Sequence, residues 1–401
     1  MSSFMLEPST PLASLAPSEQ AQSTVLSNAR IVLPGEVSKG SVLIEDGLIA
    51  GIDPFPAPSH RVIECAGDYL VPGLIDLHTD NIEHHFFPRP GVQWPSSTAA
   101  VLSHDWQMLG AGVTTVLDSL SLGDYESSGR RVAMLRSAIA AFDKAIASRR
   151  LRADHYFHFR CEVSDPNLME ILEPNVDHPR LRLLSVMDHT PGQRQWRNLA
   201  IFRSYRGKKK GQTWSDEEFD RYVSERRLLQ STYASAFRER IAAISAAKRL
   251  PLASHDDTTI GDVDQSHAEG MTICEFPTTI EAAQHARRLG MRVVMGSPNI
   301  VLGRSHSGNV SAAELADQRL LDVLTSDYVP ASLLHSAFLL ASGDVDLHEA
   351  IAMATSGPAD LLGFKDRGRI APGLRADLLR VRVIDGVPII VGIWTAGHQV
   401  V

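Results

Sequence analysis

Cysteine is scarce in this chain. Its 401 residues include three cysteines, Cys65, Cys161 and Cys274, which lie far apart and form no C-x-x-C pair. This spacing excludes both a disulfide framework and a zinc site made of cysteines. We therefore expect reduced, buried thiols in a cytoplasmic protein.

Long apolar runs and an excess of positive charge are also absent. No apolar run reaches the roughly 18 residues that a membrane-spanning helix needs, so we expect no membrane insertion. The formal net charge of −8 argues against a nucleic-acid-binding surface but permits a local basic pocket. Residues 1–22 are rich in Ser, Pro and Ala and lack the basic segment of a signal peptide. They predict a flexible N-terminal extension.

The two ends of the chain share one pattern. Short strand-like segments separated by turn residues, such as Pro34-Gly35 and Asp46-Gly47, fill residues 23–70. The same pattern resumes in residues 367–401. Short strands joined by tight turns are typical of hairpins. We predict that the two ends form one small composite β-sandwich domain.

The middle of the chain, residues 71–366, alternates differently. Apolar segments of strand length recur eight times, and amphipathic, helix-like stretches separate them. This alternation predicts an α/β protein with a TIM-like (β/α)8 barrel. A doubly wound open sheet is the competing fold, but the G-x-G-x-x-G turn that accompanies it is absent after the first strand. The predicted strands are 71–78, 113–118, 155–161, 182–187, 251–254, 272–276, 292–296 and 322–326.

Imidazole and carboxylate side chains follow five of these predicted strands. Because the carboxyl ends of barrel strands form one rim, we expect these side chains to converge. Such donors suit divalent ions, zinc or manganese in particular. We predict one or two ions, bridged by Glu162 if there are two, with Asp327 as both ligand and proton acceptor. The predicted ligands are His78 and Asp80 after the first strand, Glu162 after the third, His189 after the fourth, His255 after the fifth and Asp327 after the eighth.

Several longer motifs surround these residues. They are residues 78–95 (HTDNIEHHFFPRPGVQWP), 188–195 (DHTPGQRQ), 254–257 (SHDD), 296–299 (GSPN) and 305–309 (SHSGN). With these motifs, the chain resembles the amidohydrolase superfamily over about residues 25–400, and within it the PhnM family of phosphonate-metabolism proteins.

This resemblance implies a hydrolase of phosphonate catabolism. Its expected reaction converts α-D-ribose 1-methylphosphonate 5-triphosphate to the 5-phosphate and pyrophosphate, with metal-bound hydroxide attacking the α-phosphorus. Three positions depart from the superfamily's pattern: Asp80 replaces a histidine, Glu162 replaces a carboxylated lysine, and the sixth strand ends in Glu275. The number of ions therefore stays open.

A triphosphate needs cations and hydrogen-bond donors. Arginine suits bidentate binding of phosphate, and loops after the seventh and eighth barrel strands often bind it. Backbone N–H groups in a glycine-containing turn can hold phosphate oxygens. We also interpret the long insertion at 190–224 as a lid over the site. The predicted substrate-binding residues are Arg89, Arg194, Arg304, His306, Ser307 and Asn309.

Two other functions stay open at this point. One is a different hydrolase on the same scaffold, namely a cyclic amidohydrolase, a deacetylase or a deaminase, because the metals would be shared. The other is a non-catalytic barrel that serves as a scaffold. We expect a small phosphorylated molecule as partner, with neither nucleic acid nor membrane, and a homo-oligomer is left open.

Overall fold

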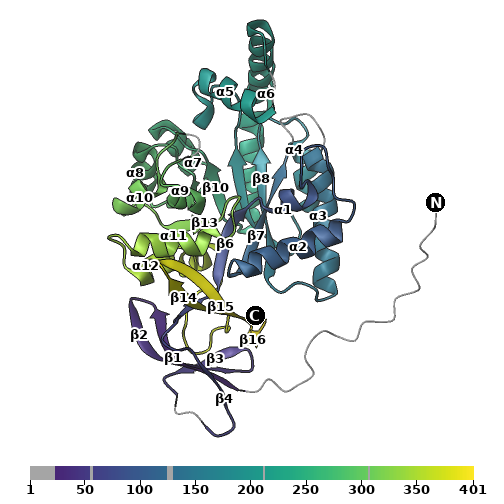
Figure 1. Cartoon of the computed structure of the whole chain (residues 1–401). Coiled ribbons are helices and arrows are strands. Elements are labelled where there is room, and N and C mark those ends of the chain that lie inside the picture. The colour runs from purple at the N-terminus through teal and green to yellow at the C-terminus, as the bar shows by residue number, and fades with distance from the viewer. Residues whose placement is uncertain (1–22, 55–56, 124–129, 211–212, 306–307) are drawn as a thin grey trace, which may run out of the picture.

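The computed structural model describes residues 23–54, 57–123, 130–210, 213–305 and 308–401. The predicted extension at 1–22 and the predicted substrate-binding residues His306 and Ser307 lie outside the described residues. The chain forms a barrel with a separate sheet below it, and two helices project above the barrel (Figure 1). Within the described residues, no helix has the length and apolar character needed to cross a bilayer.

Eight parallel strands form the barrel and follow one another in chain order. The first and last strands meet through a bridge between Thr79 and Asp327. There the Asp327 N–H donates to the His78 carbonyl at 3.0 Å. The predicted (β/α)8 barrel is confirmed. Its strands are β6 (Leu74–Thr79), β7 (Val113–Leu122), β8 (Asp154–Glu162), β9 (Leu181–Met187), β10 (Leu252–His255), β11 (Ile273–Glu275), β12 (Arg292–Gly296) and β13 (Val323–Thr325).

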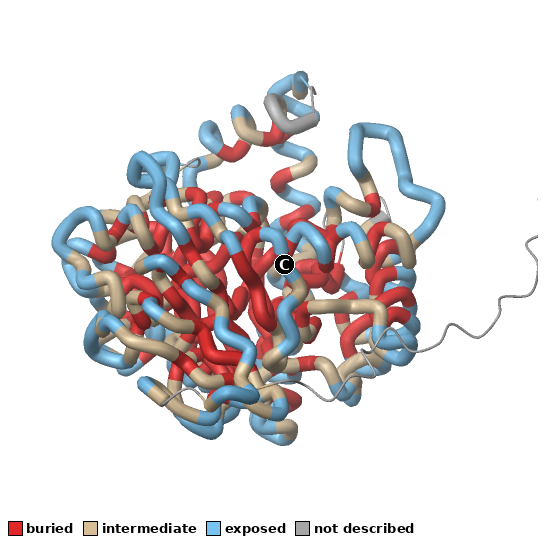
Figure 2. Tube along the Cα trace, turned by 60° about the horizontal axis from the view of Figure 1, so that its bottom comes forward, coloured by how far each residue is buried: buried red, intermediate tan, exposed pale blue. Residues whose placement is uncertain are grey.

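Helices cover the outside of the barrel, and the buried residues gather on its strands (Figure 2). Several helices begin at capping residues that the sequence supplies, as at Ser215, Thr259 and Ser311. The helices are α1 (Ile82–Phe86), α2 (Ser97–Gly110), α3 (Arg130–Ala147), α4 (Leu168–Leu172), α5 (Leu199–Lys210), α6 (Asp216–Lys248), α7 (Ile260–Ala268), α8 (Ile280–Arg288), α9 (Ser297–Val301), α10 (Ala312–Asp317), α11 (Ser332–Ala341), α12 (Leu347–Ala352) and α13 (Ser356–Leu362), with 3-10 turns η1 (Glu173–Asn175) and η2 (Arg194–Trp196).

Strands from both chain ends form the second sheet, which is largely antiparallel, as predicted. β5 pairs with β14 and so joins the two ends. The strands make one branched sheet, because β1 pairs with both β4 and β5. The predicted domain boundary at residues 70 and 71 falls within β5, and the domain limits stay a prediction. The strands are β1 (Thr24–Leu33), β2 (Glu36–Glu45), β3 (Leu48–Ile52), β4 (Arg61–Glu64), β5 (Tyr69–Pro72), β14 (Leu378–Ile384), β15 (Val387–Thr395) and β16 (His398–Gln399).

The insertion after β9 forms the projecting pair α5 and α6. A small aromatic core that includes Trp196, Phe202 and Phe219 holds the pair together. The middle of α6 is tied to the loop after β9, since Gln230 Nε2 donates to Asp188 Oδ2 at 3.1 Å. The pair therefore rises from the carboxyl ends of the barrel strands. Its predicted role as a lid stays a prediction.

An ion-pair cluster fastens the C-terminal segment to the base of the barrel. Arg367 donates to Asp154 Oδ2 at 2.7 Å, and Arg375 donates to the same oxygen. Burial raises the pKa of Asp154, but the two guanidinium groups outweigh it and lower the pKa to about 2. A carboxylate with a depressed pKa stabilises the folded state above its unfolded pKa near 3.8.

We expect Asp154→Asn to lower the free energy of unfolding by about 2 kcal/mol at pH 7. The difference from the unmodified protein should shrink as the pH falls from 3.8 towards 2, because Asp154 then becomes protonated in both states. Urea unfolding at pH 7 and pH 3 measures both effects. Asp344→Asn makes the same change at an exposed carboxylate and should leave both values unchanged. An equal loss at both pH values would contradict this account.

Candidate metal centre

The inner face of the barrel changes from apolar to polar along several of its strands. One apolar cluster takes residues from all eight barrel strands and so lies inside the barrel. Since every second residue of a strand faces the same way, the residue two positions further on also points inward. Three inward pairs show the change: Tyr156 with His158, Ala253 with His255 and Ile273 with Glu275. The carboxyl ends of the strands therefore surround a polar opening, which we call the mouth.

All six predicted metal ligands lie at the mouth. His78 lies near the end of β6 and Asp80 directly follows that strand. Glu162 and His255 are the last residues of β8 and β10, and His189 and Asp327 each follow a strand by two residues. Three of the side chains are buried, namely His78, Glu162 and His255. The other three, Asp80, His189 and Asp327, are half-buried. All six thus lie at or near the carboxyl ends of barrel strands, and their roles as ligands stay predictions.

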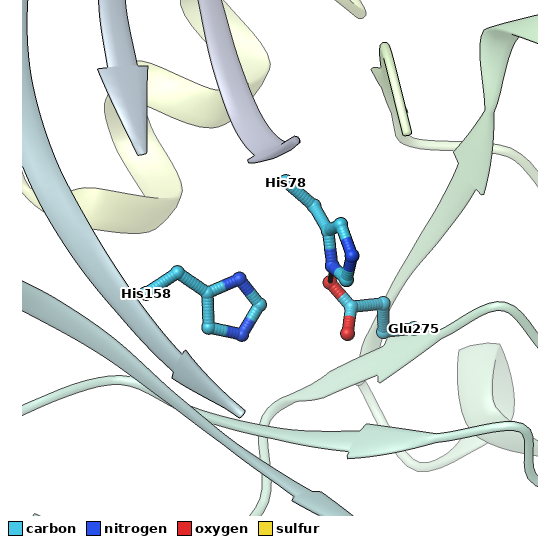
Figure 3. A group of neighbouring side chains, drawn as sticks. All are labelled: His78, His158 and Glu275. Carbon is cyan, nitrogen blue, oxygen red and sulfur yellow. Dashed lines mark hydrogen bonds and ion pairs between the residues drawn. The ribbon is translucent and has the colours of Figure 1, made fainter. Parts of the chain in front are cut away.

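Glu275 joins two of these histidines (Figure 3 shows it with His78). Its carboxylate accepts from His78 Nδ1 at 2.7 Å and from His255 Nδ1 at 2.9 Å. The two rings lie 6.0 Å apart and nearly parallel. Because an ionised carboxylate only accepts hydrogen bonds, each Nδ1 carries a proton and each Nε2 keeps a lone pair. Carboxylates orient metal-binding histidines in this way.

Burial keeps these imidazoles neutral. It lowers the pKa of His255 to about 3, and burial with the charge of Arg160 holds the pKa of His78 well below its usual value. A neutral ring is the form that binds a metal ion. The site therefore needs no deprotonation of these histidines before it binds an ion near neutral pH.

A second carboxylate orients His189. Glu162 accepts from His189 Nδ1 at 2.6 Å and from Ser164 at 2.8 Å. Burial raises the pKa of Glu162, but the neighbouring His189 outweighs it and lowers that pKa. These are the contacts of a carboxylate that orients a histidine, and the predicted bridging role of Glu162 stays a prediction.

Three potential ligand atoms converge beside this pair. Asp256 Oδ2 lies 3.9 Å from His189 Nε2 and 3.7 Å from His255 Nε2. Ligand atoms of a tetrahedral zinc ion lie about 3.3 Å apart, given bonds of about 2 Å. The three atoms are therefore close to the spacing that an ion requires. Gln195 also donates to Asp256 and fixes its orientation.

His158 is a potential ligand that the sequence-based prediction missed. Its ring lies 5.0 Å from that of His78, and His158, His78 and Glu275 form a second group with metal-ligand spacing (Figure 3). Its Nδ1 bonds with Ser119, whereas its buried Nε2 has no hydrogen-bond partner among the described residues. An unpartnered buried ring nitrogen beside a carboxylate is a suitable donor to a cation. The donor set as a whole therefore fits one or two divalent ions.

Asp327 and Asp80 form a carboxylate pair where the barrel closes. Burial, followed by the charge of Asp80, raises the pKa of Asp327 to about 8. The pKa of Asp80 is raised too, first by burial. Arg160 Nη1 lies 3.8 Å from Asp80 Oδ2 and balances part of this charge. A carboxyl group with so high a proton affinity suits transfer of a proton near neutral pH.

The predicted substrate-binding residues differ in their exposure and surroundings. Arg89 and Arg304 are exposed, and Asn309 is half-buried. Arg194 is buried and paired with Asp257, so its charge is already balanced inside the protein. Substrate contacts of these four residues stay predictions. Arg160, which the sequence-based prediction left out, is the arginine that the described structure places among the mouth carboxylates.

Comparisons with known proteins show which family this chain belongs to. Residues 230–385 match the model of the Amidohydrolase family. The chain is 41% identical over 379 residues to the alpha-D-ribose 1-methylphosphonate 5-triphosphate diphosphatase of Escherichia coli (strain K12), covering 94% of this chain and 100% of that protein. The chain belongs to the PhnM family of amidohydrolases. The resemblance seen in the sequence is confirmed, and a PhnM family member is expected to be a hydrolase.

More distant relatives share the scaffold with this PhnM family member. An adenine deaminase of Desulfatibacillum aliphaticivorans is 25% identical over 375 residues, covering 89% of this chain and 54% of that protein. The solved N-isopropylammelide isopropylaminohydrolase from Burkholderia multivorans is 16% identical, with a TM-score of 0.61 over 94% of this chain and 98% of that one. The N-acetylglucosamine-6-phosphate deacetylase from Pasteurella multocida is 12% identical, with a TM-score of 0.60 over 94% and 99%. These two structures support the fold alone.

Proposed function

We propose that the chain hydrolyses α-D-ribose 1-methylphosphonate 5-triphosphate to the 5-phosphate and pyrophosphate. The observation that carries this proposal is the 41% identity to the Escherichia coli diphosphatase along that protein's whole length. The polar mouth supports it, because hydrolysis of a phosphoric anhydride needs a proton acceptor and compensation of negative charge. A cytoplasmic location and a homo-oligomer stay predictions.

One or two divalent ions, zinc or manganese, are part of the proposal. A bound ion would make water acidic enough to ionise near neutral pH and would withdraw charge from phosphoryl oxygens. Neutral histidines oriented by Glu162 and Glu275 are suited to hold it. The residues that would hold the ions are His78, Asp80, Glu162, His189, His255 and Asp327, with His158 and Asp256 added by the geometry. Glu275 would orient His78 and His255.

The chain's own groups would complete the reaction. Asp327 would accept the proton of the attacking water at its carboxylate, which lies beside that of Asp80. Glu162 would keep His189 in one orientation through its hydrogen bond. Arg160 would offset negative charge at the α-phosphate, as guanidinium groups do in phosphoryl transfer.

Phosphorus NMR tests this proposal directly. The purified protein with added Zn²⁺ or Mn²⁺ should convert the ribose methylphosphonate triphosphate into pyrophosphate and the 5-phosphate, and a chelator should stop the conversion. Adenine deamination and hydantoin ring opening, assayed in parallel, should be slower by about 10³-fold or more in kcat/KM, because those reactions gain nothing from charge compensation at a triphosphate. Ring opening or deamination without pyrophosphate release would identify a different hydrolase. Inactivity of metal-loaded protein in every assay would favour the non-catalytic scaffold.

A further inference from the structure

A second group of buried ionisable side chains lies outside the mouth. His104 and Asp105 come from α2, Asp118 from β7 and His155 from β8. Each is at most 1% exposed. Buried charges of this kind are costly unless they are paired and hydrogen-bonded. Their partners therefore show what the group does.

The hydrogen bonds of this group run in one line. His104 Nε2 donates to Asp118 Oδ1 at 2.6 Å, and His155 Nδ1 donates to Asp118 Oδ2 at 2.8 Å. His155 Nε2 reaches Asp105 Oδ1 at 3.3 Å. His155 thus faces a carboxylate on each side. Burial lowers its pKa, but Asp118 and Asp105 outweigh burial and raise it to about 9.

One end of the line reaches the mouth through Asn81. This residue follows Asp80 directly and is 2% exposed. Its Nδ2 donates to His104 Nδ1 at 3.1 Å and to Gln107 Oε1 at 3.0 Å. Since His104 accepts at Nδ1, its proton must lie on Nε2, where it meets Asp118. The line therefore fixes both the ring of His104 and the backbone next to Asp80.

The other end reaches the beginning of β8. Asp105 Oδ1 accepts from the backbone N–H groups of Arg152 and Ala153, each at 3.0 Å. These residues directly precede β8, which carries His158, Arg160 and Glu162 to the mouth. The same line of bonds thus connects two of the strands that supply the mouth.

A metal ion is the alternative occupant of this group. Ligand atoms of His104, Asp118 and His155 lie within 4.8 Å of one another. Each of these atoms already has a hydrogen-bond partner, however, and the protonated His155 supplies positive charge between the two carboxylates. The geometry is that of a satisfied hydrogen-bond network, in contrast to the unpartnered Nε2 of His158.

We propose that His104, Asp118, His155 and Asp105 are positioning residues, which hold Asn81 and through it set the place of Asp80 at the mouth. This inference rests on the proposed function, because it assigns Asp80 to the metal centre. The network would favour ion binding by fixing a ligand in advance, as outer hydrogen-bond partners do in metal sites.

Two substitutions of His104 test its hydrogen bonds to Asn81 and to Asp118 separately. In His104→Gln the amide nitrogen takes the place of Nε2, so the bond to Asp118 is kept and the bond to Asn81 is lost. In His104→Asn the amide oxygen takes the place of Nδ1, so the bond to Asn81 is kept. Arg367→Met is the matched control, since it removes a buried charge at the barrel base, far from the mouth.

Zn²⁺ affinity of each purified, folded variant, measured by competition with a chromophoric chelator, is the readout. We expect His104→Gln to weaken binding by about 10-fold or more. His104→Asn keeps the contact with Asn81 but loses the bond to Asp118, so it should weaken binding by a smaller factor. Arg367→Met should lower the melting temperature without changing the affinity. Asn81→Ala removes the same contact and should match His104→Gln, which keeps the test valid if a His104 variant does not fold.

Failure of the positioning role and failure of the proposed function give different results. Unchanged Zn²⁺ affinity in both His104→Gln and Asn81→Ala would overturn the positioning role. Zn²⁺ bound by the unmodified protein at the His104 group, seen as loss of affinity in Asp118→Asn but not in His255→Ala, would also overturn it. A protein that binds Zn²⁺ with the expected variant pattern but releases no pyrophosphate would instead contradict only the proposed function.

Discussion

Replacing Asp327 with Asn should lower kcat by about 10³-fold while the protein keeps its fold. Removal of a general base typically costs 10²–10⁴-fold, and the surroundings of Asp327 are those of a proton acceptor: burial and the nearby Asp80 raise its pKa to about 8. Asparagine keeps the shape of the side chain but cannot take the proton. Initial rates of pyrophosphate release, with the metal content of each sample measured, give the result.

The control for this variant is Asp317→Asn. It makes the same chemical change at an exposed carboxylate at the end of α10, and its kcat should stay within about 2-fold of the unmodified value. If Asp327→Asn turned over substrate at a near-normal rate with its full metal content, Asp327 would not be the proton acceptor. If it lost both metal and activity, the residue would act mainly as a ligand.

Replacing His255 with Ala should abolish metal binding and activity together. His255 is held at Nδ1 by Glu275, and its Nε2 lies beside Asp256 and opposite His189. Loss of this ring removes a donor from the converging group and leaves Glu275 without one of its two histidines. We expect the affinity for Zn²⁺ to fall by more than about 100-fold, beyond the 10–100-fold that loss of an outer partner costs.

A graded series makes this second prediction sharper. Glu275→Gln keeps both histidines but weakens their orientation, so its loss of Zn²⁺ affinity should lie between the unmodified protein and His255→Ala. His285→Ala, on the helix surface and bonded to Asp264, should behave as the unmodified protein. Metal per chain after dialysis, measured by mass spectrometry, tests the series. Full metal content in His255→Ala would remove His255 from the centre.

Much of the barrel could be predicted because its strands are buried on both faces. Such strands appear as short apolar runs, and ligand-type residues at their ends, such as His78 and His255, stand out against them. His158 could not be found this way, because it lies within β8 and not at its end. Glu275 was recognised as the end of the sixth strand, but its contact with two histidines depends on how β6, β10 and β11 face each other.

The bounds of the insertion after β9 were predicted less well than the barrel strands. The predicted segment ended at residue 224, whereas α6 begins at Asp216 and runs without interruption to Lys248. The sequence does hold the signal for this start, since Ser215 and Glu218 form a capping box. The network around His104 could not be predicted at all, because its partners are 14 to 50 residues apart and meet only when α2 packs on β7 and β8.

The central claim is that imidazoles and carboxylates from separate strands hold a divalent ion at the mouth. Crystals of the Zn²⁺-loaded protein, measured at the zinc absorption edge, test this claim most directly through the anomalous signal. The account predicts a peak within about 2.0–2.2 Å of ring nitrogens of His189 or His255. A peak at His104, Asp118 and His155, or none anywhere at the mouth, would contradict it.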